Sequence, residues 1–486
     1  MSAVRSALGF AFLERYLMTA LTLVSFALLA RLLTPRQIGL YSVSLALISV
    51  AHVVRDFGLA NYLIQRKTLE PDDIATALGL SLLMGSTLFL AATLGAPLVA
   101  GFYNAPALTP VVRVIALNFL ILPLTSILVA LMRREMQFNV LMRINVCVGV
   151  LSTATTLGLA WGGFGTASLA WGEVVSNLGI TAGALLAGAG RRLLRPRLVR
   201  WRAVLGFGGP LTAANIVTSI SMDISDLVVG KVLNFTDVAI ASRAQGMMNL
   251  FHRDIMGTVR AVAYPAFARA NREGHGLEQQ YQASLTAVLA VAWPFYGFMA
   301  LFPLEVLRLM FGPQWDQAAR LVPWFCLAGA FGVLVSLIPT LLMAAGHTRA
   351  TASADLVLQP VRAVVMCLVL LHYRDLLPFT LAYLAMAVIA VPYFYAIKQR
   401  CLATDGAALA RTVWRNALLA GLTLAPALGL ASLLRQPGQT LAYPWFFGCI
   451  GLTALAWLVL LWALRHPLWH EIRTLLQQRL ARRTAA

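Results

Sequence analysis

The sequence predicts an all-α polytopic membrane protein of about 14 transmembrane helices, with two six-helix lobes followed by two further helices. Three observations predict this fold. The 486 residues are 59% hydrophobic and only 12% charged, well outside the range of soluble domains. Apolar stretches of about 20 residues, the length that crosses a hydrocarbon core, recur along the whole chain. Basic residues collect in every second gap between these stretches.

The apolar stretches occupy most of the chain, and no gap between them is long enough for a soluble domain. No cleavable signal peptide is expected, because the first stretch is long and more stretches follow it. The predicted spans are residues 8–33, 37–62, 74–101, 108–132, 139–162, 165–189, 204–230, 237–264, 280–303, 319–345, 351–371, 376–397, 411–434 and 441–464.

The net charge of +19 would also suit a nucleic-acid-binding protein, but its distribution favours a membrane topology. With a cytoplasmic N-terminus, every inside segment carries Arg or Lys, and the strongest run lies at residues 191–202. The alternate gaps hold isolated residues such as Arg36 and Lys231, or none. Because cytoplasmic loops of membrane proteins are enriched in Lys and Arg, we expect both termini in the cytoplasm, with the helices in the inner membrane. No nucleic-acid partner is expected.

The basic run divides the chain into related halves. Residues 30–42 align with residues 230–242 at a constant offset of 200, with corresponding small, basic, apolar and serine positions. An even number of helices per half makes the repeat parallel, as in several transporter folds, with a groove at the bilayer midplane. We therefore expect an N-terminal lobe at 1–190, a basic cytoplasmic linker at 191–203 and a C-terminal lobe at 204–400. Residues 401–486 supply two extra helices and a basic tail, which is predicted to lie on the inner leaflet as an amphipathic helix.

The eighth predicted span, residues 237–264, is unusually polar. Hydropathy alone would reject this segment as a membrane span. If it did not cross the membrane, however, every later loop would lie on the opposite side, and the basic C-terminal tail would lie outside the cytoplasm. A helix this polar can cross a membrane only if its polar face meets protein or water. On a helical wheel that face, about 140° wide, carries Arg243, Asn249, Arg253, Asp254 and Arg260.

The second span carries a matching pair, Arg55-Asp56, at a depth similar to that of Arg253-Asp254. We therefore expect the two pairs to face each other across the groove. The candidate substrate-binding residues are Arg55, Arg243, Asn249, Arg253 and Arg260. Arginine binds phosphate through two parallel hydrogen bonds and stays charged in apolar surroundings, so these residues predict an anionic substrate. A pyrophosphate-linked lipid fits this chemistry. The alternative is that these arginines pair with carboxylates for packing alone.

Several carboxylates are candidates for gating or for coupling to a cation, which would be a proton or sodium. Asp223 and Asp226 share a face of the seventh span with Asn215, Thr218 and Ser219. The remaining candidates are Asp56, Asp254 and Glu173, and Asp355 is a further isolated acid. No cofactor, metal site or catalytic residue is expected. The five cysteines form no CxxC pair, and the sequence has no Walker A, HExxH or GxSxG motif, so the protein is predicted not to be an enzyme.

Several short motifs resemble the polysaccharide transporter family, the Wzx-type flippases of the multidrug/oligosaccharidyl-lipid/polysaccharide (MOP) exporter superfamily. They are Ala-Arg-Leu-Leu-Thr-Pro at residues 30–35 followed by Gly39, Asp-Phe-Gly-Leu at 56–59, Leu-Ile-Gln-Arg at 63–66, Arg-Arg-Glu-Met-Gln-Phe at 133–138, Phe-Gly-Pro-Gln-Trp at 311–315 and Ala-Ala-Gly-His at 344–347. The resemblance covers nearly the whole chain. One departure is that members often have Gly-Tyr-Tyr at the start of the eighth helix, where this chain has Val-Ala-Ile-Ala-Ser-Arg at residues 238–243.

The resemblance implies flipping of undecaprenyl-pyrophosphate-linked oligosaccharide across the inner membrane by alternating access, for exopolysaccharide, capsule or O-antigen synthesis. It implies cavity-lining roles for Arg55 and Arg253, with membrane lipids and polysaccharide assembly proteins as partners. Two alternatives stay open at this point. One is a peptidoglycan-precursor or drug exporter of the same superfamily. The other is a polytopic oligosaccharide polymerase or ligase, which usually carries a large periplasmic loop; the longest outside gap here, residues 304–318, is too short for one.

Overall fold

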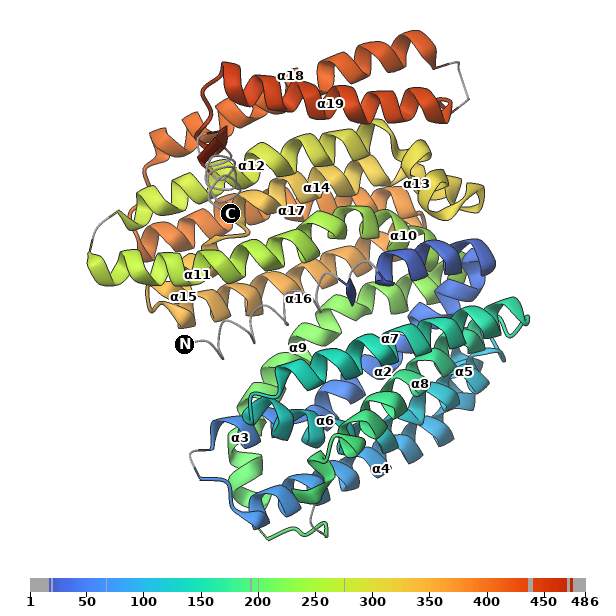
Figure 1. The fold of residues 1–486 in the computed structure, drawn as a ribbon. Coiled ribbons are helices and arrows are strands. Elements are labelled where there is room, and N and C mark those ends of the chain that lie inside the picture. The colour runs from blue at the N-terminus through green and yellow to red at the C-terminus, as the bar shows by residue number, and fades with distance from the viewer. Residues whose placement is uncertain are drawn as a thin grey trace, which may run out of the picture. The chain divides into compact units, whose positions relative to one another are not determined.

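The computed structural model describes residues 17–18, 21–66, 68–192, 195–199, 201–274, 276–435, 440–469 and 473–474. Across these residues the regular structure is helical, with no strand (Figure 1). Eleven of the described helices are long and apolar enough to cross a membrane. The prediction of an all-α polytopic membrane protein is confirmed.

The helices follow one another with short connections. The first half of the chain contains α2 (Pro35–Asp56), α3 (Leu59–Gln65), α4 (Pro71–Tyr103), α5 (Leu108–Ala116), α6 (Asn118–Arg134), α7 (Phe138–Trp161), α8 (Thr166–Leu186), the 3-10 helix η1 (Ala189–Arg192) and α9 (Trp201–Val232). The second half contains α10 (Phe235–Asn249), the π-helix η2 (Leu250–Ile255), α11 (Met256–Glu273), α12 (Leu277–Leu301), α13 (Pro303–Phe311), the 3-10 helix η3 (Pro313–Arg320), α14 (Val322–Val335), α15 (Ile338–Ala344), α16 (Thr348–Tyr373), α17 (Leu376–Cys401), α18 (Gly406–Leu434) and α19 (Tyr443–Ala463).

Three of the fourteen predicted spans are not among the eleven apolar helices. The first, 8–33, lies largely outside the described residues, of which Leu21–Leu32 form a shorter apolar helix. The seventh corresponds to α9, and the eighth corresponds to the continuous helical segment α10–η2–α11. Both are helical over a full membrane-crossing length, so the fold is compatible with 14 spans. The predicted amphipathic tail falls almost entirely outside the described residues.

The contacts between helices divide the chain into two compact units, Met1–Ala239 and Ile240–Ala486. Helix α9 belongs to the first unit, where it packs along α2. The predicted lobes, 1–190 and 204–400, rest on the sequence repeat, and their boundaries stay a prediction. The two units are described separately below.

The turns at the two ends of the 200-residue repeat have the same local structure. Before α2, the Gln37 amide N donates to Thr34 Oγ1 at 3.4 Å, and the Thr34 amide N donates to Gln37 Oε1 at 2.9 Å. Before α10, the Asp237 amide N donates to Asn234 Oδ1 at 3.0 Å, and Asn234 Nδ2 donates to Asp237 Oδ2 at 2.7 Å. In both turns the side chain of the residue before the helix accepts from the amide N three residues later, which satisfies one free N–H group at the helix start. The second bond satisfies another backbone N–H before α2, whereas before α10 it joins two side chains. The weak sequence match therefore marks a matched pair of helix starts.

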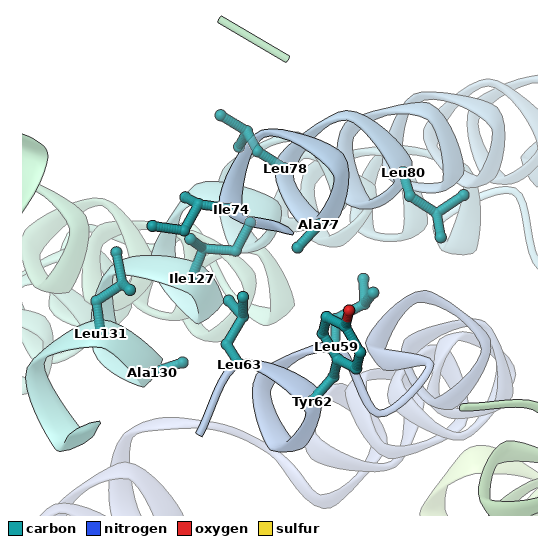
Figure 2. Close-up of a cluster of buried hydrophobic side chains, with 10 residues drawn as sticks. All are labelled: Leu59, Tyr62, Leu63, Ile74, Ala77, Leu78, Leu80, Ile127, Ala130 and Leu131. Atoms are coloured by element: carbon teal, nitrogen blue, oxygen red, sulfur yellow. The ribbon is translucent and has the colours of Figure 1, made fainter. Parts of the chain in front are cut away.

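The first unit has an apolar cluster where α3, α4 and α6 meet. Figure 2 shows its side chains: Leu59, Tyr62 and Leu63 of α3, Ile74, Ala77, Leu78 and Leu80 of α4, and Ile127, Ala130 and Leu131 of α6. Beside it, the fully buried Asp73 accepts hydrogen bonds from the Tyr62 hydroxyl at 3.0 Å and from the Glu70 amide N at 3.1 Å. Arg134 Nη1 donates to the Leu63 carbonyl oxygen at 2.7 Å. These bonds fix the short helix α3 against α4 and α6.

In the second unit an ion-pair network joins the loop before α19 to α13. Arg308 Nη2 and Nε donate to both carboxylate oxygens of Asp316, at 2.5 and 2.8 Å. The carboxylate of Glu305, which is 2% exposed, accepts from Arg435 Nη2 at 2.6 Å and from the Leu441 amide N at 3.1 Å. The packed pair α18 and α19 is thereby tied to the rest of its unit at one end.

A buried lysine ties the opposite end of the same helix pair. Lys398 near the end of α17 is fully buried, and its ammonium donates to Glu278 Oε2 at 2.6 Å and to Thr404 Oγ1 at 2.9 Å. It also lies 4.8 Å from the centre of the Tyr281 ring. One charge thus links α12, α17 and the segment that leads into α18.

Replacing Lys398 with methionine should destabilise the protein by about 3–5 kcal/mol, because removing one partner of a buried pair leaves the other charge uncompensated. Thermal unfolding of the purified protein in detergent would measure this change. The double variant Lys398→Met with Glu278→Gln removes both charges, and it should recover most of the loss. If Lys398→Met were as stable as the unmodified protein, the buried pair of Lys398 and Glu278 would not stabilise the second unit.

Candidate functional site

Arg55 lies at the end of α2 in the first unit and is 6% exposed. Its Nη2 donates to Asp56 Oδ1 at 2.7 Å, and the Asp56 side chain is 63% exposed. Arg55 Nε and Nη1 are buried without a hydrogen-bond partner among the described residues. Buried donors without acceptors are costly, so this position suits a bound anion.

The chain direction changes immediately after this arginine. Phe57 and Gly58 have φ angles of 35° and 65°, in the left-handed region, and they separate α2 from α3. One turn before Arg55, the His52 ring packs against the Phe119 ring with centroids 4.9 Å apart. Arg55 therefore projects from the last turn of a helix whose end is fixed by a sharp break and by packing on α6.

The candidate carboxylates of the first unit lie on α8 and α9. Glu173 is half-buried, and its Oε2 accepts a hydrogen bond from the Tyr41 hydroxyl of α2 at 3.2 Å. On α9, the Ser219 hydroxyl donates to Asp223 Oδ2 at 3.3 Å, and Asp226 lies one turn further along, also half-buried. The Asn215 and Thr218 side chains lie outside the described atoms. The structure thus separates Glu173 from the α9 carboxylates, and a role in coupling stays a prediction for all three.

A helix that is continuous from Phe235 to Glu273 begins at the end of the first unit, runs into the second and changes type in the middle. Residues Leu250–Ile255 are π-helical, and Arg253 lies within them with an exposed side chain. Asn249 immediately precedes the π-helix and is half-buried. The Asp254 side chain lies outside the described atoms. Single π-helical turns are frequent at functional sites, so this position supports Arg253 as a candidate.

Arg243 lies one helical segment earlier, and its contacts differ from those of the other candidates. Its guanidinium lies 4.9 Å from the centres of both the Phe311 and the Trp315 rings. Trp315 is fully buried. The Phe-Gly-Pro-Gln-Trp motif at residues 311–315 therefore supplies two aromatic faces for this arginine, a contact that stabilises a cation. These contacts give Arg243 a packing role, and its assignment to substrate binding stays a prediction.

A group of basic side chains gathers around His252. Arg260 of α11 and Arg362 of α16 both lie within electrostatic range of the His252 ring. Arg362 Nη2 donates to Gln359 Oε1 at 2.6 Å, and its guanidinium lies 5.4 Å from the centre of the Tyr383 ring. The sequence analysis did not select Arg362 or His252. The available signal was an arginine in the interior of an apolar helix with a glutamine one turn before it.

Arg55 and Arg253 belong to different units, so their expected position opposite each other stays a prediction. Within each unit the structure gives one arginine-centred position. In the first it is the buried Arg55 with two free N–H groups. In the second it is the group formed by His252, Arg260 and Arg362. Positive charge inside an apolar helical protein is rare and marks functional pathways, and it favours an anionic ligand over a cationic one.

Comparison with known proteins identifies the family. Residues 28–320 match the family model described as polysaccharide biosynthesis protein. The chain is 27% identical to the lipopolysaccharide biosynthesis protein WzxC of Escherichia coli (strain K12) over 330 residues, which are 67% of this chain and 66% of that protein. It is 25% identical to the teichuronic acid biosynthesis protein TuaB of Bacillus subtilis (strain 168) over 336 residues, which are 68% of each. The match spans just under two thirds of WzxC.

Solved structures with a similar fold belong to transporters. The lipid II flippase MurJ in an inward closed conformation has a TM-score of 0.69 at 13% identity, covering 93% of this chain and 97% of MurJ. An inward-facing multidrug transporter of the MATE family of the MOP superfamily has a TM-score of 0.61 at 15% identity, covering 81% of this chain and 96% of the transporter. At these identities the likeness shows the fold. Because the family model matches residues 28–320, the chain belongs to the family described as polysaccharide biosynthesis protein, and it shares the fold of the MurJ and MATE transporters.

Proposed function

We propose that this protein moves undecaprenyl-pyrophosphate-linked oligosaccharide across the bacterial inner membrane by alternating access, for exopolysaccharide, capsule or O-antigen synthesis. The observation that supports this most strongly is Arg55, whose Nε and Nη1 are buried without an acceptor. Guanidinium groups bind pyrophosphate through parallel hydrogen bonds. The polyprenyl tail of such a substrate stays in the bilayer while its charged head is held by protein groups.

The proposal also includes the direction of transport and the residue that balances the negative charge of the substrate. We place both termini in the cytoplasm, as the distribution of basic loops indicates. The substrate head is taken up from the cytoplasmic leaflet, and the Arg55 guanidinium neutralises charge on the pyrophosphate. A cationic drug would be repelled by this guanidinium. The names of two relatives, which make lipopolysaccharide and teichuronic acid, support a polysaccharide precursor as the cargo.

The leaflet in which substrate accumulates tests this function directly. In a strain that lacks the protein, lipid-linked units should accumulate on the cytoplasmic leaflet, where they stay inaccessible to a glycan-binding probe added outside spheroplasts. Accumulation on the periplasmic leaflet would instead indicate a polymerase or ligase. Accumulation of lipid II in place of polymer units would indicate a peptidoglycan-precursor exporter.

Replacing Arg253 with alanine should abolish polysaccharide export while membrane insertion stays normal, because an exposed side chain contributes little to folding. The measurement is surface polysaccharide per cell, with protein in the membrane fraction quantified by immunoblot. A matched control is Arg269→Ala on the same continuous helix. Arg269 forms an exposed i,i+4 pair with Glu273, which is worth about 0.3–0.5 kcal/mol. Normal export by Arg253→Ala would remove Arg253 from the mechanism.

A further inference from the structure

Tyr296 of α12 makes a hydrogen bond to the backbone of the helix that carries Arg253. Its hydroxyl donates to the Met248 carbonyl oxygen at 3.3 Å, and both side chains are buried. Met248 lies two residues before the π-helical segment Leu250–Ile255. A carbonyl oxygen inside a helix normally accepts from the amide four residues later, so a bond from another helix marks a place where this ladder is disturbed. Tyr296 therefore reaches the backbone where the helix changes from α to π.

Aromatic packing holds the same turn against α12. Phe251, the second residue of the π-helical segment, is buried, and its ring centroid lies 5.5 Å from that of Phe295 and 5.6 Å from that of Tyr296. Tilted rings at such separations attract each other beyond the effect of burial alone. Because the Tyr296 ring contacts Phe251 and its hydroxyl contacts Met248, Tyr296 holds the chain on both sides of the junction between α and π geometry.

Two glycines of α14 make room for this arrangement. A Cβ atom at Gly329 would lie 2.7 Å from Met248 Cγ and 2.7 Å from Tyr296 Cζ. Three residues later, a Cβ atom at Gly332 would lie 3.3 Å from His252 Cε1, within the π-helical segment. Residues three apart lie on the same face of a helix. This face of α14 therefore accommodates the buried tyrosine and the π-helical turn because it has no side chain at either position.

The π-helical turn determines the direction in which Arg253 points. Within the turn the Met256 amide N donates to the Phe251 carbonyl oxygen, five residues earlier. Successive residues of a π-helix are therefore rotated by less than the 100° of an α-helix. The Arg253 side chain is exposed, whereas Phe251 and Met256 are buried. A change of this segment to α-helical geometry would turn Arg253 to another direction without any change in its own side chain.

We propose that Tyr296 is a positioning residue for transport: its hydroxyl bond and ring contacts keep the segment Leu250–Ile255 π-helical, and the π-helical turn presents Arg253 to the substrate. The proposal rests on the proposed function, in which Arg253 takes part. Tyr296 is itself buried, so it acts on transport through the backbone of the π-helical turn.

Hydrogen exchange of the purified protein in lipid nanodiscs, measured by mass spectrometry, tests the first step without any substrate. Tyr296→Phe keeps the ring and removes only the hydroxyl. The amides of residues 248–256 should then exchange about fivefold faster, the factor that corresponds to the loss of a typical buried hydrogen bond. Tyr393→Phe is the matched control, because the Tyr393 hydroxyl also donates to a helix carbonyl oxygen, that of Ala354, at 3.4 Å. It should leave exchange at residues 248–256 unchanged.

Thiol labelling tests the second step. Arg253→Cys, in a protein whose five native cysteines are replaced by alanine, reports the accessibility of position 253 to a charged thiol reagent. Adding Tyr296→Phe should change the labelling rate about twofold or more, and adding Tyr393→Phe should not. In cells with the native Arg253, Tyr296→Phe should lower polysaccharide export severalfold at a normal amount of protein in the membrane, whereas Tyr393→Phe should export normally.

Any one of three results would overturn the proposal. Unchanged amide exchange in Tyr296→Phe would show that the hydroxyl does not hold the π-helical turn. Unchanged labelling at position 253 would show that the turn does not set the direction of this residue. Normal export by Tyr296→Phe would show that this direction does not matter for transport. A wrong assignment of the cargo would appear in the leaflet experiment and would leave the exchange and labelling results unchanged, so the two failures are distinguishable.

Discussion

Replacing Arg55 with alanine should abolish polysaccharide export, and replacing it with lysine should leave only a small residual rate. Arg55 is 6% exposed and keeps two N–H groups free of hydrogen bonds. Lysine would restore the charge but not the planar fork that binds pyrophosphate through two bonds. Surface polysaccharide per cell, normalised to protein in the membrane, measures the effect.

Asp56→Asn provides the control for the Arg55 variants. It removes the partner of the ion pair but leaves the guanidinium in place, and the Asp56 side chain is 63% exposed. Exposed pairs contribute about 0–1 kcal/mol, so this variant should be stable. Its export should exceed that of Arg55→Ala. If Asp56→Asn and Arg55→Ala lost export equally, export would depend on the ion pair between Arg55 and Asp56 and not on the free N–H groups of Arg55.

Replacing Gly39 with alanine should destabilise the first unit by about 3 kcal/mol or more, at the upper end of the effects of overpacking. A Cβ atom at this position would lie 1.6 Å from the Phe235 carbonyl oxygen. Because the obstacle is backbone, no side-chain rotation can relieve the clash, and α2 must move away from the start of α10. Thermal unfolding in detergent, together with the amount of protein in the membrane, measures the loss.

The same substitution at Gly158 of α7 is the matched control. Nothing lies within 4 Å of a Cβ built at Gly158. Alanine in a helix interior is favoured over glycine by about 1 kcal/mol, so Gly158→Ala should be neutral or slightly stabilising. A Gly39→Ala variant as stable as Gly158→Ala would show that α2 and the start of α10 are further apart than the structure places them.

Much of this fold could be predicted from the sequence because hydropathy and charge act over whole helices. The spans at 74–101, 139–162 and 376–397 each match a single helix, α4, α7 and α17. The breaks inside other spans could not be predicted in the same way. Phe57 adopts a φ of 35°, which is unfavourable for a residue with a side chain, and packing of α3 against α4 and α6 stabilises it.

The candidate site was predicted less completely than the fold. A helical wheel shows on which side of its helix a side chain lies, but it does not show which residue of another helix that side chain contacts. Arg243 was grouped with Arg253 and Arg260 by angle, yet aromatic rings on residues 311 and 315 take up its guanidinium. Arg362 was not among the candidate residues, yet its guanidinium donates to Gln359 and lies over the Tyr383 ring. Such partners come from segments distant in sequence, and only tertiary packing brings them together.

The π-helical segment Leu250–Ile255 has a consequence for how related chains should be aligned. Hydrogen bonds from residue i to i+5 fit one more residue into a turn than an α-helix holds. Everything after it is therefore rotated out of phase, and Arg260 points about 100° away from where an uninterrupted helix would aim it. A homologue that lacks one amino acid here and has an uninterrupted α-helix would therefore present its later basic side chains in the same directions. A one-residue gap in an alignment thus belongs inside this segment, because the π-helical turn absorbs the extra residue and the later charges keep their neighbours.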